Sequence, residues 1–591
     1  MESSESSRSR RKCCYNLPVS GLFLQEMKKL CTFAVPITLT AMLMATMSIA
    51  CVVFVGRLGE SELAAVGLAL SIFNVAGFSV MHGLLSTCIT VFSQTFGSGN
   101  KYRMGIELQK AIYITSICSI CCWGVFLSIE PLLLAIKINP RIAKMSAEYL
   151  VYMIPAIFFA SGVSVLEKYI QSQNKMIPPL VIWASVNILN ALIHYILLFL
   201  LEIGIKGSAI AQSVSYLCAT VLMISYLYFS KLYKNTWNGY SHAMWYDWGS
   251  WLKLGIPGLA MIALKWWYFE IGLILVGTVG VSELAAQTLL INLNQTFYNL
   301  FSVGLSIACS IIVGQSLGAG EADVPIVTTL AGLFLTCVGM LLAAILLLAL
   351  RWQVPKIFTS DPNVIAIAAQ CMPLFGIFLI FEGAVGVMGG AIRGSGLQPL
   401  GALTIFICLY ILSAPLGFTL LLKSNLKLTG LWIGFATGLF LISIVYLILL
   451  LRTNWQKQIR LAAKRTKKQI EQTDSYDSIE ISGISSEEES AVKKTSLDSN
   501  QMEQTGVVGS TSEKEQSVWC VIVSRSLFTA GMLLIFVAGL VLKLSLPLSD
   551  MFGIACLRKN GTFLWVPTAN ASDPIYLNLF AASENCTIFI P

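Results

Sequence analysis

Long apolar runs separated by short polar stretches dominate residues 31–451 of the chain. Each run has about 20 residues, the length at which a helix crosses the hydrocarbon core of a bilayer. A segment inside lipid must satisfy its own backbone hydrogen bonds, so the runs are predicted to be membrane-spanning helices. Twelve are predicted, at residues 31–55, 65–92, 112–132, 147–168, 177–201, 207–230, 253–278, 284–313, 326–350, 365–391, 399–422 and 428–451.

The polar pattern after the twelfth run divides the rest of the chain. Residues 453–520 are rich in Ser, Glu and Lys and too hydrophilic to fold alone, which predicts a disordered linker. Residues 521–545 form one more apolar run, a thirteenth predicted span, and residues 546–591 are a tail. The predicted fold class is therefore an all-α polytopic membrane protein.

An internal repeat relates the two halves of the twelve-span block. The segment "VGRLGESELAAVGL" begins at Val55, and "VGTVGVSELAAQTL" begins at Val276, 221 positions later (276 − 55). The same offset relates Pro36 to Pro257, and the matches concentrate on Pro, Gly, Gln and a Ser-Glu pair rather than on apolar residues that any span shares. Two six-helix lobes are expected, residues 31–230 and 253–452, joined by a loop at 231–252.

The repeat also predicts an activity. Its offset covers an even number of spans, so both lobes enter the membrane from the same side and are related by an axis along the membrane normal. Two facing lobes suit alternating access, in which a cavity between them opens to one side and then to the other. The chain contains no GxxxxGK[ST] phosphate-binding loop, so an ion gradient is the expected energy source. Transport is the predicted function, and an enzyme is not expected.

Composition and charge agree with a membrane protein and set its orientation. Hydrophobic residues make up 56% of the chain and charged residues 12%, and the mean hydropathy is +0.75. Basic residues cluster at the N-terminus (residues 1–30), which lacks the apolar core of a signal peptide, and again after the twelfth span. Positive charge stays cytoplasmic, so both regions are expected in the cytosol and the tail outside.

The tail carries features of an extracellular segment. Three glycosylation sequons begin at Asn560, Asn570 and Asn585. Cys556 and Cys586 flank them, an even count that suggests a disulfide as an alternative to two free thiols. At the other terminus, Cys13 and Cys14 beside the basic cluster are candidates for palmitoylation.

Three charged residues fall deep in predicted spans. Glu270 and Glu382 are carboxylates that could alternate between a protonated neutral form and a charged form opposite a cation, although each could instead be a helix-packing residue. Trp266 and Trp267 precede Glu270 by four and three positions, so they share its helical face and suit a flat organic cation. Lys265 is the third charge.

Several motifs together resemble the multidrug and toxin extrusion family, in particular its vertebrate branch with a thirteenth helix. They are the paired "GxxGxSELAA" segments, "SQTFGSGN" and "GQSLGAGE" after spans two and eight, and "GGAIRGSG" at 389–396. The resemblance covers residues 25–455 and implies a plasma-membrane antiporter that exchanges protons for organic cations. It also implies that Tyr298, Asn292 and Asn74 line the cavity, with Asn74 alternatively a helix-to-helix hydrogen-bonding residue.

The chain departs from that family at three positions. The residues that align with Lys265, Asn292 and Ile89 are typically acidic in the vertebrate transporters, so the cavity here is less negative. Lys265 lies about 140° around the helix from Glu270 and is free to pair with Glu382 across the lobe, where it would act as an internal surrogate cation. Alternatively, it snorkels to a cytoplasmic vestibule, or it marks a preference for neutral, zwitterionic or anionic solutes.

Two other classes of membrane protein remain alternatives at this point. A lipid-linked sugar flippase would share the wider fold but would need a strongly basic cavity, for which Lys265 is the one candidate. A non-transporting receptor or scaffold would work through its linker and tail and would not need a duplication with intramembrane glutamates. The expected partners are small organic solutes and membrane lipid, without nucleic acid, metal or cofactor, in a monomer. The coupling ion is expected to be H⁺, with Na⁺ as an alternative.

Overall fold

The computed structural model describes residues 21–136 and 138–466, and five short segments of the C-terminal region, 529–531, 533–541, 555–558, 563–565 and 586–589. Cys13, Cys14, most of the linker and the sequon asparagines Asn560, Asn570 and Asn585 lie outside the described residues. Palmitoylation, glycosylation and disorder of the linker beyond residue 466 therefore stay predictions. The first part of the predicted disordered linker is instead a helix, residues 455–466, because Trp455 and Ala462 are buried in the core of the second half.

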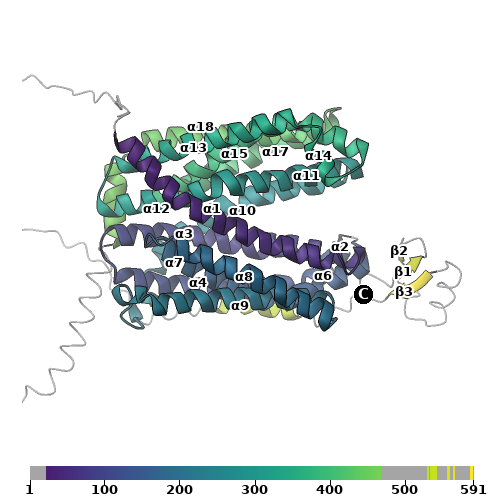
Figure 1. Ribbon diagram of the computed structural model, residues 1–591, viewed down its shortest axis with the longest axis horizontal. Helices are drawn as coiled ribbons and strands as arrows, with labels where there is room; N and C mark the ends of the chain where they lie inside the picture. Colours follow the sequence, from purple (N-terminus) through teal and green to yellow (C-terminus); the bar gives the residue numbers. More distant parts are fainter. Residues whose placement is uncertain are drawn as a thin grey trace, which may run out of the picture.

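Long apolar helices form the body of the molecule, and they follow the predicted spans (Figure 1). Within the described residues, eleven helices or continuous helix runs are long and apolar enough to cross a membrane, and a bent pair makes a twelfth. In the first half they are α1 (Gly21–Val55), α2 (Glu60–Ile72) continued by η1 (Phe73–Phe78) and α3 (Ser79–Gly97), α4 (Arg103–Leu127), the bent pair α6 (Pro140–Tyr152) and α7 (Ile154–Gln171), α8 (Ile177–Tyr195) with η2 (Ile196–Leu200), and α9 (Ile205–Phe229).

The second half repeats this order. Its spans are α10 (Trp248–Gly277), α11 (Val281–Tyr298) continued by η5 (Asn299–Val303) and α12 (Gly304–Ala319), α13 (Val324–Ala349), α15 (Pro362–Ser395), α16 (Gln398–Ile405) with η6 (Phe406–Ser413) and α17 (Ala414–Lys423), and α18 (Lys427–Arg452). Short helices fill the connections: α5 (Ile129–Ala135), η3 (Leu232–Asn235), η4 (His242–Trp245) and α14 (Val354–Phe358).

The first helix begins at Gly21, earlier than the expected residue 31, because a polar residue in its first turns has a partner. Glu26 is buried, and its carboxylate accepts a hydrogen bond of 2.9 Å from the Thr328 hydroxyl of α13. A glutamate in a sequence looks like the edge of a span, whereas here it is satisfied inside the bundle.

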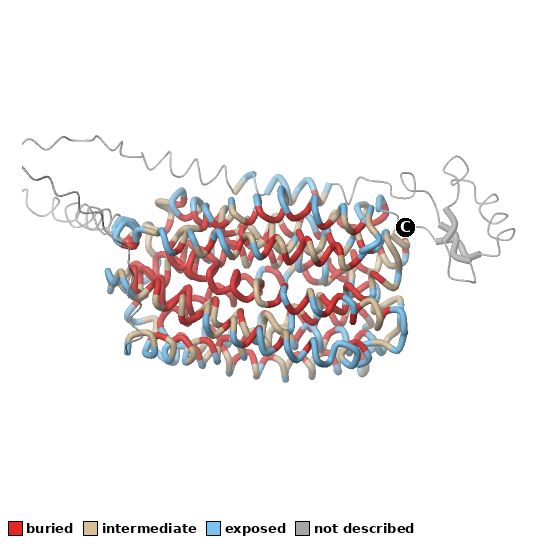
Figure 2. The backbone as a smooth tube through the Cα atoms, turned by 90° about the horizontal axis from the view of Figure 1, so that it is seen from above, coloured by how far each residue is buried: buried red, intermediate tan, exposed pale blue. Residues whose placement is uncertain are grey.

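The helices form two groups, and α1 crosses from one to the other (Figure 1). One apolar core is built from residues of α3, α4, α7 and α9, and the other from residues of α11, α12, α13, α15 and α18. Buried residues concentrate in the interior, and exposed ones lie on the outside of the bundle (Figure 2). In a membrane, an apolar outer surface faces lipid, so each group needs only its own packed interior.

The 221-residue offset reappears in the contacts between the groups. A side chain at Gly83 of α3 would collide with the backbone of Leu259 on α10, and one at Gly304 of α12 would collide with α1 at Thr38. Both pairs are related by the offset, since 83 + 221 = 304 and 38 + 221 = 259. Glycine permits this close approach of two backbones, and because of the duplication the same contact occurs at two places.

Wide π-helical turns interrupt corresponding spans of the two halves. They lie in the second and fifth spans (η1 and η2) and in the eighth and eleventh (η5 and η6). Each leaves backbone carbonyl groups out of the regular ladder, and such turns are frequent at functional sites. The hydrophobic pattern did not predict them.

The C-terminal region adds a helix and a small sheet. The helical residues from Thr529 to Val541 lie against α4, where Phe536 packs edge-on against Trp123 at a ring-centroid distance of 6.2 Å. The all-α fold class is incomplete for the tail, where β1 (Ala555–Arg558) pairs antiparallel with both β2 (Phe563–Trp565) and β3 (Cys586–Phe589). The register pairs Cys556 with Ile588 and Cys586 with Arg558, so the two cysteines stand two positions apart on neighbouring strands.

Candidate functional site

A lysine and a glutamate form an ion pair inside the second lobe. Lys265 Nζ of α10 donates to Glu382 Oε1 of α15 at 2.7 Å, and their side chains are 13% and 3% exposed. This is the partner that the sequence analysis considered for Lys265. The second oxygen, Glu382 Oε2, is buried and has no hydrogen-bond partner among the described residues. The pair is thus electrically neutral but only partly satisfied.

An aromatic ring covers the ammonium group of this pair. The ring centroid of Tyr298, at the end of α11, lies 4.6 Å from Lys265 Nζ, within cation–π range. Gly386 leaves room for the ring, because a Cβ at this position would meet the Tyr298 side chain. Lys265, Glu382 and Tyr298, singled out separately in the sequence, therefore form one cluster.

Glu270 lies elsewhere on α10 and has no charged partner among the described residues. It is half-buried, and the five-residue spacing keeps it apart from the ion pair, as the helical geometry predicts. Of Glu270 and Glu382, the second is therefore neutralised by a lysine and the first is not.

The two tryptophans before Glu270 face the first lobe. Trp267 is 39% exposed, and its indole N–H donates to the Val75 carbonyl of η1 at 3.5 Å. Trp266 lies 6.4 Å, between ring centroids, from His82 of α3. The side of α10 that bears both indoles thus meets the wide turn of the second span and the helix that follows it.

The two predicted asparagines are not part of the ion-pair cluster. Asn74 is exposed on η1, next to the Val75 carbonyl that Trp267 contacts. Asn292 is exposed on α11 together with Gln295 and Thr296. Polar side chains exposed on membrane-spanning helices are costly in lipid, which favours a water-accessible surface at these positions.

Sequence reasoning missed two residues beside this site. His82 of α3 is half-buried, stacks near Trp266 and has an Nε2 without a hydrogen-bond partner among the described residues. Arg393 of α15 donates to the Ser306 hydroxyl of α12 at 2.8 Å. Both were visible as rare charged or titratable residues in apolar spans, and Arg393 lay inside the "GGAIRGSG" motif that was used only for the resemblance.

Buried charges also fill the first lobe, and the sequence analysis did not include them. Glu107 of α4 bridges to Arg103 and Lys110 at 3.5 and 3.3 Å, and Glu167 of α7 pairs with Lys168 at 2.7 Å. Each of these residues carries an opposite charge beside it, which favours a packing role over an open binding site.

The two lobes are joined at the end of the bundle where α1 begins and α18 ends, which we term the terminal end (left in Figure 1). Gln94 of α3 donates to the Gly394 carbonyl at 3.0 Å, and the Thr90 hydroxyl donates to the Arg393 carbonyl at 2.6 Å. Both acceptors belong to the "GGAIRGSG" segment of α15. That motif therefore forms an inter-lobe contact.

Contacts at the terminal end again come in symmetric pairs. A side chain at Gly97 would strike the backbone of Gln315, and a side chain at Gly318 would strike the backbone of Gln94. The offset relates both, because 97 + 221 = 318 and 94 + 221 = 315. The motifs "SQTFGSGN" and "GQSLGAGE", which form the C-terminal ends of α3 and α12, thus pack against each other.

A helix after α18 closes the same end. Residues 455–466 are helical, and Trp455 and Ala462 are buried in the core of the second lobe. Near its end, Arg465 Nη1 donates to Gln94 Oε1 of the first lobe at 3.2 Å, and its guanidinium lies against Gly396 of the second. In this structure the lobes are therefore fastened together at the terminal end.

Comparisons with known proteins agree with this architecture. The MatE family model matches the chain twice, at residues 36–196 and 257–419, and the two matches begin 221 positions apart (257 − 36). Multidrug and toxin extrusion protein 2 of Mus musculus is 36% identical over 451 residues, 76% of this chain and 78% of that protein. Multidrug and toxin extrusion protein 1 of Danio rerio is 35% identical over 78% of each.

Solved structures show the same fold. The crystal structure of the eukaryotic MATE transporter AtDTX14 superposes with a TM-score of 0.72 at 26% identity and covers 75% of this chain and all of that one. The Vibrio cholerae MATE transporter VcmN in the bent form superposes with a TM-score of 0.66 at 16% identity, over 75% of this chain and 99% of that one. With its duplicated family match and its relatives along most of its length, the chain belongs to the multidrug and toxin extrusion (MATE) family of multi-pass membrane transporters.

Proposed function

We propose that the protein is a secondary antiporter that exports organic cations in exchange for protons by alternating access. The observation that carries this proposal is the contrast between Glu270 and Glu382, the two glutamates of the second lobe that the sequence singled out. Glu382 is neutralised by Lys265, whereas Glu270 has no charged partner among the described residues and follows two tryptophans that face the opposite lobe.

Glu270 is the residue at which proton and substrate compete. A carboxylate at a low-dielectric position is stable either with a proton or opposite a cation, so binding of one releases the other. Trp266 and Trp267 supply aromatic faces to the organic cation. This competition at one carboxylate is sufficient to couple the two movements.

Lys265 is an internal cation at the second glutamate. It holds Glu382 as an ion pair, and the ring of Tyr298 stabilises the ammonium group by a cation–π contact. Asn292 stands where the relatives' pattern has an acid, so the charge that remains for substrate is mainly that of Glu270. Asn74 and Asn292 provide polar contacts on the exposed surface of their helices.

We further propose that the terminal end faces the cytosol, in the plasma membrane. Basic residues cluster before α1 and after α18, the two segments that leave the bundle at this end. The apolar segment that includes Thr529–Val541 then acts as a thirteenth span and carries the tail, with its sequons and the Cys556 and Cys586 pair, to the outside. The lobes are fastened at the cytosolic end, which corresponds to the outward-facing half of the cycle.

A transporter of zwitterionic or neutral solutes is the second candidate, and the ion pair itself favours it. With Glu382 neutralised by Lys265, this pair contributes no net charge that would attract a cation. A solute with both charges could then replace the pair, its carboxylate on Lys265 and its amine on Glu382.

Uptake into proteoliposomes separates the two candidates. The purified protein is reconstituted and given an outward proton gradient, with three labelled probes of similar size: a quaternary ammonium, a zwitterionic amino acid derivative and an aromatic carboxylate. The antiporter account predicts gradient-driven uptake of the quaternary ammonium alone. Uptake of the zwitterion without the ammonium would establish the second candidate instead.

A further inference from the structure

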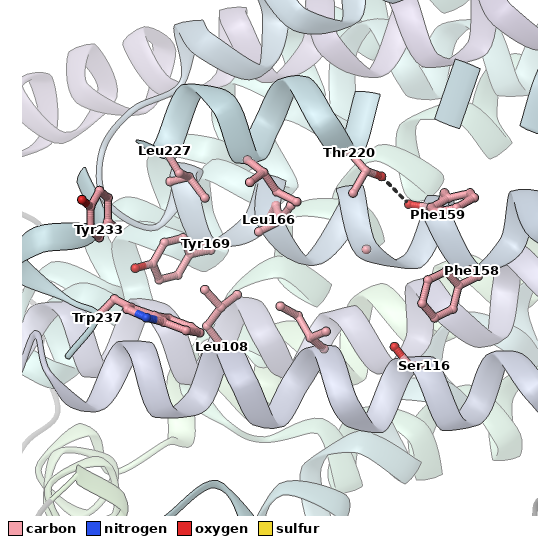
Figure 3. A pocket seen from close by; sticks show the side chains of 13 residues that line it. Leu108, Ser116, Phe158, Phe159, Leu166, Tyr169, Thr220, Leu227, Tyr233 and Trp237 are labelled. Carbon is pink, nitrogen blue, oxygen red and sulfur yellow. Dashed lines mark hydrogen bonds between the residues drawn. The ribbon is translucent and has the colours of Figure 1, made fainter. Parts of the chain in front are cut away.

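An apolar groove lies on the first lobe, between α4, α7 and α9 (Figure 3). It has a volume of about 340 Å³, and its wall includes Leu108, Leu166 and Leu227. The Thr220 hydroxyl in the wall already donates to the Phe159 carbonyl at 3.1 Å, and the Tyr169 hydroxyl is hydrogen-bonded to Thr236. Apart from the Ser116 hydroxyl and the Tyr233 and Trp237 side chains, a ligand therefore meets hydrocarbon in this groove.

The groove opens to the lipid phase rather than to the transport site. Ile112, Phe158 and Ile224 line it and are exposed on the outer surface of three membrane-spanning helices. All of its lining residues belong to the first lobe and to the turns that follow it, whereas Lys265, Glu382 and Glu270 belong to the second. The surrounding bilayer can enter it directly.

The rim at the terminal end is basic and aromatic. Tyr233 and Trp237 line the groove after α9 has ended, and Lys231 and Lys234 flank Tyr233 with exposed side chains. Aromatic and basic residues at the end of a span lie at the level of the lipid head groups. No acidic residue occurs between positions 231 and 237 or in the groove wall, so the local charge attracts a phosphate.

We propose that the groove binds one acyl chain of an anionic glycerophospholipid, whose head group is held by Lys231 and Lys234. An acyl chain fits a wall without free hydrogen-bonding partners at Tyr169 and Thr220, and two lysines select a negative head group over a zwitterionic one. This site rests on the groove and its rim and is independent of the proposed antiport. Its lipid would fix the position of α9 against α4 and α7.

Native mass spectrometry of the full-length protein tests the chain-binding part of the site. The protein in detergent micelles is mixed with phosphatidylglycerol or phosphatidylcholine of identical acyl chains, and bound lipids are counted. A Cβ at Gly162 meets only Thr220 Cγ2, at 3.8 Å, so Gly162→Ala is tolerated, whereas the longer side chain of Gly162→Leu fills the groove. We expect Gly162→Leu to lose one bound phosphatidylglycerol and Gly162→Ala to keep it.

Matched variants control for general effects on the surface. Gly67→Leu places the same side chain at an exposed glycine of α2 with no atom within 4 Å of its Cβ, and it should bind as the wild type does. The double variant Lys231→Ser/Lys234→Ser should remove the preference for phosphatidylglycerol over phosphatidylcholine. Each lysine is expected to contribute a factor of about five to that affinity ratio. Lys28→Ser with Lys29→Ser, exposed lysines of α1, should preserve it.

The proposal would be overturned by either of two results. Equal lipid binding by the wild type and Gly162→Leu would show that the chain lies elsewhere. Equal binding of the two lipids by the wild type would show that Lys231 and Lys234 do not select a head group. A detergent molecule retained in place of lipid would show that the groove does not select a phospholipid. If Gly162→Leu fails to fold, the lysine variants still decide the head-group part.

Discussion

Burial of two opposite charges at the Lys265 and Glu382 pair has a measurable consequence for stability. Removing one partner of a buried ion pair leaves the other unpaired, which costs about 3–5 kcal/mol, whereas replacing both with neutral groups of similar size is close to neutral. Lys265→Met and Glu382→Gln should therefore each lower the thermal unfolding midpoint in detergent, and the double variant should recover most of the loss. Additive losses would contradict the pair.

Glu270 is expected to behave differently, because it has no charged partner among the described residues, so its replacement leaves no opposite charge unpaired. Glu270→Gln should leave the unfolding midpoint nearly unchanged but reduce gradient-driven uptake of a quaternary ammonium by about 10- to 100-fold, the loss of a charged contact worth about 1.5–3 kcal/mol. Initial uptake rates in proteoliposomes measure it. Glu60→Gln, at an exposed acidic residue of the first turn of α2, is the matched control and should transport normally.

At the scale of single residues, the sequence predicted which charged and aromatic side chains lie deep in the membrane spans. A lysine inside a membrane span needs a partner or a water-filled cavity, so the apolar pattern gave Glu382 as one of three alternatives for Lys265, and the structure contains that pair. Trp266 and Trp267 followed from helical spacing to Glu270. His82 and Arg393 were missed because their neighbours, Trp266 and Ser306, are remote in sequence and no local pattern connects them.

At the scale of elements, the helix at residues 455–466 is expected to hold the two lobes together at the terminal end. Arg465→Ala removes the hydrogen bond to Gln94, worth about 1 kcal/mol at a half-exposed position, and should shift the ratio of open to closed terminal ends about fivefold. Spin labels at Lys101 and Glu321, exposed residues of the two lobes at this end, report the opening.

The labels are best introduced as unnatural amino acids, because the chain has 16 native cysteines. Pulsed electron spin resonance should then show a larger long-distance population for Arg465→Ala than for the wild type. Lys464→Ala, at an exposed neighbour on the same helix, serves as the control. An unchanged distance distribution in Arg465→Ala would remove this role from the helix.

The elements themselves were largely predictable, because length and apolar composition determine a membrane span. Finer features depended on tertiary partners. The early start of α1 depends on the Glu26 contact with Thr328, and the 48° bend between α6 and α7 was hidden inside one apolar run. The π-helical turns have no signal in hydrophobicity, although one of them places the Val75 carbonyl against Trp267.

At the scale of the whole molecule, the reciprocal glycines predict how the lobes close. Gly97→Leu and Gly318→Leu each place a side chain against the backbone of the other lobe, so the terminal end should remain open in either variant. The same pair of spin labels should report mainly the long distance, and transport should fall. Gly249→Leu, an exposed glycine with no atom within 4 Å of its Cβ, should behave as the wild type.

The overall architecture was predictable because the two halves repeat the same Pro, Gly, Gln and Ser-Glu residues at a constant offset. The offset between Val55 and Val276 predicted two lobes related by a parallel axis, and the inter-lobe contacts at Gly83 and Gly304 follow the same offset. The closed state of the terminal end was not predictable, since the same residues must also separate during the cycle. The sheet of the tail was missed because its strands are three or four residues long.

Proton movement coupled to substrate tests the central claim most directly. Proteoliposomes with an entrapped pH-sensitive dye and a clamped membrane potential, in sodium-free buffer, receive an external quaternary ammonium. If the protein exchanges the cation for protons at Glu270, the lumen becomes alkaline at a rate that follows uptake, and Glu270→Gln abolishes the change. Cation uptake without a change in luminal pH, or uptake that requires sodium, would contradict it.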